Sequence, residues 1–155
     1  MSIIDPRSTV RTILGAVTAT LDDDATPADI LVIYEGGPES LRYLFSYETW
    51  DVVISVGRHE EREQGETRRI QDVPLRYNAR VPVSVVSTDA TGRTAAKMLN
   101  KVRRSILGVV EANAQQEDYT IIVQQNMGRE QRMGGFDPLW RDDYTVWFRP
   151  MEGIA

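Results

Sequence analysis

The chain has 155 residues and a net charge of −5, with 12 Asp and 11 Glu against 16 Arg and two Lys. This length predicts a single domain over residues 1–155. The absence of cysteine excludes disulfides and thiolate catalysis, the single histidine His59 excludes a multi-histidine metal site, and the acid excess argues against tight wrapping of nucleic acid. No stretch approaches the ~18 apolar residues of a membrane span, and the start MSIIDPRSTVR lacks a signal-peptide pattern, so we expect no membrane partner and no secretion.

The first predicted element is a helix. Asp5 is a good N-cap residue and Pro6 fits the first helical position. Apolar residues then recur at helical spacing as Val10, Ile13, Leu14, Val17 and Leu21.

An acidic run, residues 22–24, follows this helix, and Thr26-Pro27 stops the helical pattern. We interpret the run as a solvated loop. A calcium site is the alternative, although the spacing lacks the alternating ligands of a calcium loop.

Two apolar runs, Ile30–Tyr34 and Trp50–Val56, are typical of strands. The segment Gly57–Arg69 is almost wholly charged, so none of its side chains can contribute to a core. We expect it to form the outer part of a long β-hairpin that protrudes from the domain.

The clearest strand pattern covers Leu75–Val85, where apolar and polar residues alternate with a period of two. Pro82 lies within it and cannot donate a ladder hydrogen bond, so the strand is predicted to be at a sheet edge or bulged there. An exposed edge is a natural place for another subunit to add.

A second helix is predicted over Thr91–Ala114, with its apolar residues on one face. The opposite face carries a basic stripe, defined by Arg93, Lys97, Lys101 and Arg104. The stripe is either a solvated helix face or a contact face for an acidic partner or a neighbouring subunit.

The remaining pattern predicts a strand over Tyr119–Gln125, an irregular excursion over Asn126–Arg141 and a last strand that Pro150 ends. In that last strand Tyr144, Val146 and Phe148 alternate with Trp147, which therefore faces outward as an interface residue. Strand runs between isolated helices predict an α+β fold, a mostly antiparallel sheet with two helices packed on it.

Enzyme chemistry has little support in the sequence. It contains no Gly-rich phosphate loop and no nucleophile elbow. His59 precedes Glu60 and Glu61, which could form an acid–base pair, but a solvated histidine is the simpler interpretation. We therefore expect no enzyme activity, no catalytic or metal residues and no cofactor.

The order and texture of these elements resemble the tail terminator (tail completion) proteins of long-tailed phages and related tailed viruses. The resemblance covers most of the chain and includes the central stretch LRYNARVPVSVVS, the helix GRTAAKMLNKVRRSILGVV and the closing stretch RMGGFDPLWRDDYTVWFRPMEG. It implies a homo-oligomer, a hexameric ring that caps the tail tube, ends its polymerisation and joins it to a head-side connector protein. It further implies a place in the virion and double-stranded DNA that passes through the lumen without specific binding. The chain departs from the family in its extended hairpin and its extended 126–141 loop.

We therefore expect the function to reside in interfaces. The hairpin would reach a neighbouring subunit, and the basic stripe would pair with acidic groups across a contact. The candidate interface residues are Arg58, Glu61, Arg62, Arg68, Arg69, Pro82, Arg93, Lys97, Lys101, Arg104 and Trp147.

Two alternatives remain open. One is another neck component, either a head–tail connector or a head completion protein. The other is a small ligand-binding or enzymatic α+β domain, which a deep pocket at His59 or Arg132 would favour.

Overall fold

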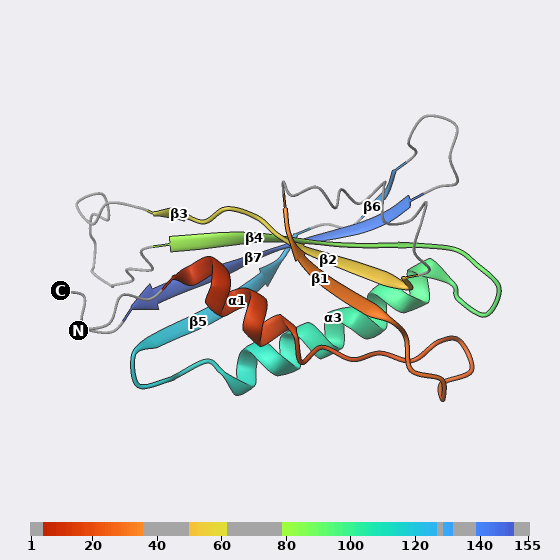
Figure 1. The fold of residues 1–155 in the computed structure, drawn as a ribbon, viewed down its shortest axis with the longest axis horizontal. Helices are drawn as coiled ribbons and strands as arrows, with labels where there is room; N and C mark the ends of the chain where they lie inside the picture. Colours follow the sequence, from red (N-terminus) through yellow and green to blue (C-terminus); the bar gives the residue numbers. More distant parts are fainter. Residues whose placement is uncertain (1–4, 36–49, 62–78, 127–128, 132–138, 151–155) are drawn as a thin grey trace.

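A computed structural model describes residues 5–35, 50–61, 79–126, 129–131 and 139–150. The described elements are, in chain order (Figure 1), α1 (Pro6–Leu14), β1 (Ile30–Tyr34), β2 (Val52–Val56), β3 (Glu60–Glu61), β4 (Ala79–Thr88), α3 (Ala95–Ala112), β5 (Tyr119–Gln125), β6 (Arg129–Gln131) and β7 (Leu139–Pro150).

The strands form one mixed, mostly antiparallel sheet. Its main order is β1-β2-β4-β7-β5, with β3 pairing β4 and β6 pairing β7. The neighbours β1 and β2 run parallel and the other pairs are antiparallel. The predicted α+β class is therefore confirmed. The protruding hairpin is not confirmed, because only β3 and residues 57–59 of it are described and residues 62–78 lie outside the described chain.

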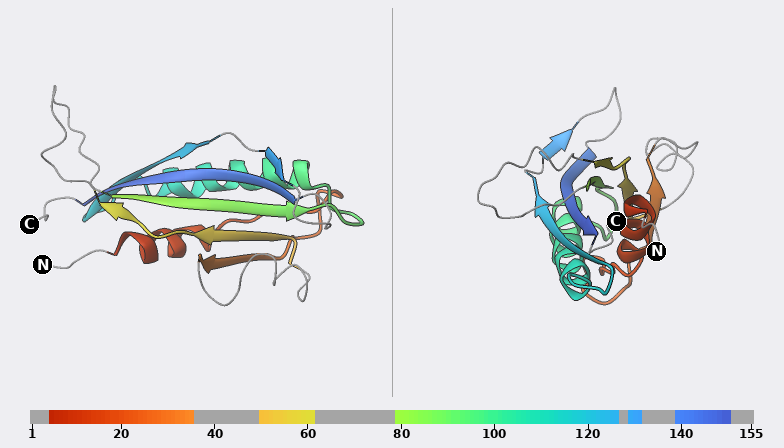
Figure 2. Two further views of the ribbon diagram at one scale, coloured as in Figure 1. Left: turned by 90° about the horizontal axis from the view of Figure 1, so that it is seen from above. Right: turned by 90° about the vertical axis from the view of Figure 1, so that its left-hand side faces the viewer.

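Both helices cover the same face of this sheet (Figure 2). Helix α1 contacts β1, β2 and β4, while α3 contacts β4, β7 and β5, so each helix covers about half of the sheet. The core between them contains Leu14, Ile54, Met98, Tyr144 and Phe148, each at most 1% exposed. The result is two layers, with helices on one side of the sheet.

Helix α1 begins as predicted and ends earlier. The Asp5 carboxylate accepts a hydrogen bond from the Arg7 backbone N–H at 3.1 Å, and Pro6 occupies the first turn. The helix stops at Leu14, because Gly15 and the β-branched residues after it are weak helix formers. Val17 is nevertheless buried and Leu21 is half-buried, so the apolar pattern continues into an irregular segment that packs on the core.

Strand β4 occupies the interior of the sheet, so Pro82 does not mark a sheet edge. The other predicted possibility, a bulge, agrees with the register, because residues 57–59 lie opposite only Val81 and Pro82. The strand pairs with β2 and β3 on one side and with β7 along its whole length on the other. Pro82 lies at the gap between β2 and β3, where its carbonyl accepts from the Gly57 N–H at 2.8 Å. Its missing N–H faces that gap, so no ladder hydrogen bond is lost.

Helix α3 begins at Ala95, later than predicted. Its first turn is capped from outside, because the Asp89 carboxylate accepts from the Ala95 N–H at 2.8 Å. Arg93 therefore precedes the helix and does not lie on its face. Neither α1 nor α3, the helices within the described residues, is long and apolar enough to cross a membrane.

The predicted irregular excursion contains strand structure. Strand β6 pairs with the first residues of β7, from Arg129 opposite Arg141 to Gln131 opposite Leu139. Strand β7 starts this early because β4 offers ten residues to pair with, up to Thr88 opposite Leu139. Local alternation predicted a last strand only near residues 144–149. Pairing with β4 extends this strand back to Leu139.

Candidate interaction surfaces

The sheet face opposite the helices presents two rows of side chains that run across β4, β7 and β5. Arg80, Trp147 and Ile122 lie side by side on β4, β7 and β5, because Arg80 pairs with Trp147 and Trp147 with Ile122. Pro82, Thr145 and Gln124 form the neighbouring row across the same three strands. Ile122 is 47% exposed and Pro82 is exposed, and no described helix covers this face. We call these six residues the open sheet face.

Trp147 lies on this face as its alternation predicted. Its neighbours Val146 and Phe148 are buried beneath the helices, while its own ring is half-buried. The indole Nε1 donates to Gln124 Oε1 at 3.3 Å, which holds the ring against β5. A large aromatic ring in such a position is typical of a protein contact.

One charged pair lies on the open sheet face and another borders it. Arg80 donates to Glu60 Oε1 at 2.7 and 2.9 Å from two of its nitrogens, across the β3–β4 pairing. At the other end Arg141 donates to Asp143 at 2.7 Å and to the Ser84 hydroxyl at 3.1 Å. The apolar residues Trp147, Ile122 and Pro82 therefore have charged pairs at both ends of the face, and an apolar centre with a polar rim is usual in protein interfaces.

The structure divides the predicted basic stripe into two kinds of residue. Arg93 forms a half-buried ion pair with Asp51 at 2.8 Å and donates to the carbonyl of Thr88 at 2.7 Å. Lys101 is also held within the chain. Only Lys97 and Arg104 of the four are exposed on α3. The stripe is thus not one continuous face, because Arg93 binds Asp51 and the end of β4 while Lys101 binds the α1–β1 loop.

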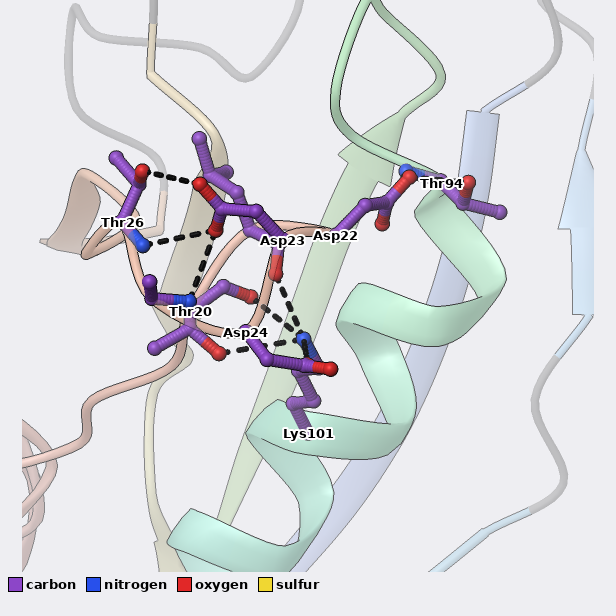
Figure 3. A network of polar contacts seen from close by, with 9 residues as sticks. Thr20, Asp22, Asp23, Asp24, Thr26, Thr94 and Lys101 are labelled. Atoms are coloured by element: carbon purple, nitrogen blue, oxygen red, sulfur yellow. Dashed lines mark hydrogen bonds and ion pairs between the residues drawn. The ribbon is translucent and has the colours of Figure 1, made fainter.

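Lys101 anchors the α1–β1 loop (Figure 3). Its Nζ donates to the carbonyl oxygens of Thr20 at 3.1 Å and Leu21 at 2.8 Å, and it forms an ion pair with Asp24 at 2.7 Å. Asp24 has a positive φ of 59°, a backbone conformation that aspartate tolerates better than most residues. One ammonium therefore closes the turn that carries all three aspartates.

Asp22 and Asp23 also make specific hydrogen bonds. Asp22 accepts from the Thr94 N–H at 3.1 Å and from its hydroxyl at 2.7 Å, and these bonds lower the pKa of Asp22. Asp23 accepts from the Thr26 hydroxyl and from two backbone N–H groups, which lower the pKa of Asp23 to about 2. The acidic run is therefore not a plain solvated loop, since Asp22 and Asp24 fix the α1–β1 loop to the start of α3.

A buried charge lies beneath α3. Asp142 is 9% exposed on the helix-facing side of β7, and burial raises its pKa while Arg103 opposes that shift. Burial and the Asp142 charge raise the pKa of neighbouring Tyr144 as well. Asp142 shares the face of Tyr144, Val146 and Phe148 because it lies two residues before Tyr144, so the alternation of β7, continued by two residues, places it in the core.

The hairpin candidates are only partly described. Arg58 is exposed, and the backbone of Glu61 pairs with Ala79. Arg62, Arg68 and Arg69 lie outside the described residues.

A shallow surface cavity of about 380 Å³ lies between α1 and the end of α3. Its lining includes Ser8, Thr12, Asn113 and Tyr119, and does not include His59. Within the described residues no group of His, Cys, Asp and Glu is arranged to hold a metal ion. A comparison with known protein families, curated proteins and solved structures found no match to this chain.

Proposed function

We propose that the chain is a structural protein of a tailed virus that assembles as a ring on the end of the tail tube. The ring, hexameric by the resemblance, ends tube polymerisation and joins the tube to a head-side connector protein while DNA passes through. The sequence resemblance over the central and closing stretches supports this assignment.

The open sheet face is the observation that carries the proposal. The described helices cover one side of the sheet only, and the other side exposes Ile122 beside Trp147. The ion pairs of Arg80 and Arg141 lie at the two ends of this face. Such a face is suited to contact with another protein, and a subunit between tube and connector requires contacts of this kind.

The first test measures the mass of the purified chain in solution and then images it alone and with preformed tail tubes. We expect rings that bind tube ends and stop tube growth. A strict monomer at high concentration that leaves tube growth unchanged would overturn the proposal. A ring that binds the connector but not the tube end would assign the chain to the neighbouring neck role.

A matched pair of variants tests the open sheet face. Ile122 and Leu107 are both large and exposed, at 47% and 41%, but they lie on the sheet face and on α3 respectively. We expect Ile122→Ser to weaken tube capping and Leu107→Ser to leave it unchanged, with both variants as stable as the parent chain. If the two variants cap tubes equally well, the open sheet face is not part of the contact with the tube.

A further inference from the structure

Helix α3 exposes one side along its length. Its buried residues, among them Met98, Val102 and Ile106, pack on the sheet (Figure 2). On the opposite side exposed residues recur at helical spacing, so they share one face. We call this the outer face of α3 and define it by Lys97, Asn100, Arg104, Leu107, Gly108 and Glu111.

The centre of the outer face combines a large apolar side chain with an open space. Leu107 is 41% exposed. Gly108 follows it, and a Cβ added there would have no atom within 4 Å. Glycine inside a helix is destabilising relative to alanine, and no contact within the described chain requires a glycine here. Gly108 instead leaves room for a side chain of another molecule to approach the helix backbone.

Opposite charges flank this centre. Arg104 lies one turn before Leu107, and Glu111 lies one turn after Gly108. They are two turns apart and cannot reach each other, and neither forms an ion pair within the described residues. Glu111 also lies in the last turn of α3, where the helix dipole disfavours an anion and no basic residue compensates it. A cation from outside the chain would relieve both costs.

We propose that two copies of the chain pair through the outer faces of α3, with the two helices antiparallel and a two-fold axis beside Leu107 and Gly108. Leu107 of each copy then fills the space above Gly108 of the other copy. Arg104 of each copy meets Glu111 of the other, so two ion pairs flank the apolar centre.

Charge complementarity selects both the occupant and its direction. A second copy offers a carboxylate and a guanidinium at the same separation as the first, and the antiparallel arrangement brings unlike charges together. A parallel arrangement would place Arg104 beside Arg104 and Glu111 beside Glu111, and like charges repel.

The contact goes beyond the ring proposed above. An isologous contact uses the same surface on both copies and closes after two of them, so it does not build a ring. It also leaves the open sheet face uncovered, because α3 lies on the other side of the sheet. One helix face is a small interface, so we expect weak pairing that depends on concentration.

The first test reverses one charge at a time. We expect Arg104→Glu alone and Glu111→Arg alone each to weaken pairing about tenfold or more at low salt, because each places like charges opposite one another. The combined variant R104E/E111R restores opposite charges and should recover most of the pairing. Arg58→Glu is the matched control, because it reverses an exposed arginine that lies between β2 and β3, and it should leave pairing unchanged.

Pairing is measured by sedimentation up to about 1 mM chain, at about 0.05 M and 0.5 M salt, two salt concentrations that differ strongly in screening. It shows as dimers of the chain, or as pairs of rings where the ring forms. Full pairing of both single variants, or no recovery in R104E/E111R, overturns the contact.

Gly108→Ala separates the contact from any loss of folding. The added methyl group favours the helix and also occupies the space that Leu107 of the other copy fills. We therefore expect a chain that melts at a higher temperature when dilute but pairs about tenfold more weakly. Pairing as strong as that of the parent chain would overturn the close approach at Gly108 and with it the proposed contact.

Leu107→Ser distinguishes this contact from the proposed function. It should weaken pairing while tube capping, which is assigned to the open sheet face, stays unchanged. Rings of the parent chain that do not pair at about 1 mM overturn the α3 contact and leave the proposed function in place. Parent chains that pair without forming rings overturn the proposed function and support the α3 contact.

Discussion

Lys101 gives the first residue-scale prediction. Its ammonium satisfies the carbonyl groups of Thr20 and Leu21 and pairs with Asp24. Lys101→Met removes these bonds and leaves partly buried acceptors unpaired, so we expect the free energy of unfolding to fall by about 1–3 kcal/mol. Lys97→Met, at an exposed position on the same helix, should change it by less than about 0.5 kcal/mol. Urea unfolding of the two variants measures the difference, and equal losses would contradict the anchoring role.

The acidic run predicts how stability depends on pH. The folded pKa values of Asp22 and Asp23 lie below the ordinary value of 3.8, so folding favours the ionised carboxylates. Their contribution is complete above pH 3.8 and is lost as the pH falls toward about 2, where Asp23 titrates in the folded chain. Unfolding measured between pH 5 and about 2 should therefore show a steeper loss for the parent chain than for Asp22→Asn/Asp23→Asn. The variant Glu111→Gln, on the exposed surface of α3, is the control.

At the scale of elements, two glycines predict opposite effects of the same substitution. Gly108 lies inside α3, and an added Cβ there would have no atom within 4 Å, so Gly108→Ala should stabilise the chain by about 0.5–1 kcal/mol. A Cβ on Gly57 would lie 2.8 Å from Pro82 Cγ and 2.9 Å from Glu35 Oε1. Gly57→Ala should therefore destabilise it by about 1–3 kcal/mol. Thermal unfolding of both variants checks the signs, and a Gly57→Ala chain as stable as the parent would contradict the close approach of Gly57 to Pro82.

The elements also show what local patterns can and cannot predict. The bounds of β1 and β5 match the predicted strands Ile30–Tyr34 and Tyr119–Gln125, because both segments are short and rich in β-branched and aromatic residues. The interior position of Pro82 is not predictable in this way, because the sequence cannot show that two strands follow one another along the same side of β4. The early start of β7 is not predictable from the local sequence either, because its pairing partners in β4 lie far away in the sequence.

The candidate surfaces divide in the same way. Alternation in β7 predicts Trp147 on the outward face, and this prediction is confirmed by the burial of Val146 and Phe148. The basic stripe is wrong as a unit because Arg93 binds Asp51 across 42 residues of sequence and Lys101 binds Asp24 across 77. Helical spacing predicts which residues share a face of a helix, but it does not predict which residues elsewhere in the chain bind them.

At the scale of the whole molecule, the sheet order predicts a gradient of protection. Backbone amides in β4 and β7 have strand partners on both sides over much of their length, whereas β1 and β5 are the outermost strands. Amide hydrogen exchange should therefore be slowest around Val83 and Val146 and faster in β1 and β5. The comparison needs the unassembled chain, because a ring contact would protect the edges as well. Equal exchange rates of the amides in all strands would contradict this strand order.

The pairing of β4 with β7 has a consequence for biosynthesis. Thr88 pairs with Leu139 and Ala79 with Phe148, so a strand from the middle of the chain depends on the last described strand. A nascent chain that has not yet reached Leu139 leaves β4 unpaired on one side and leaves β5 without its partner β7. We expect the sheet to close only when β7 leaves the ribosome, and until then the unpaired edge of β4 is a site for chaperone binding or misassembly.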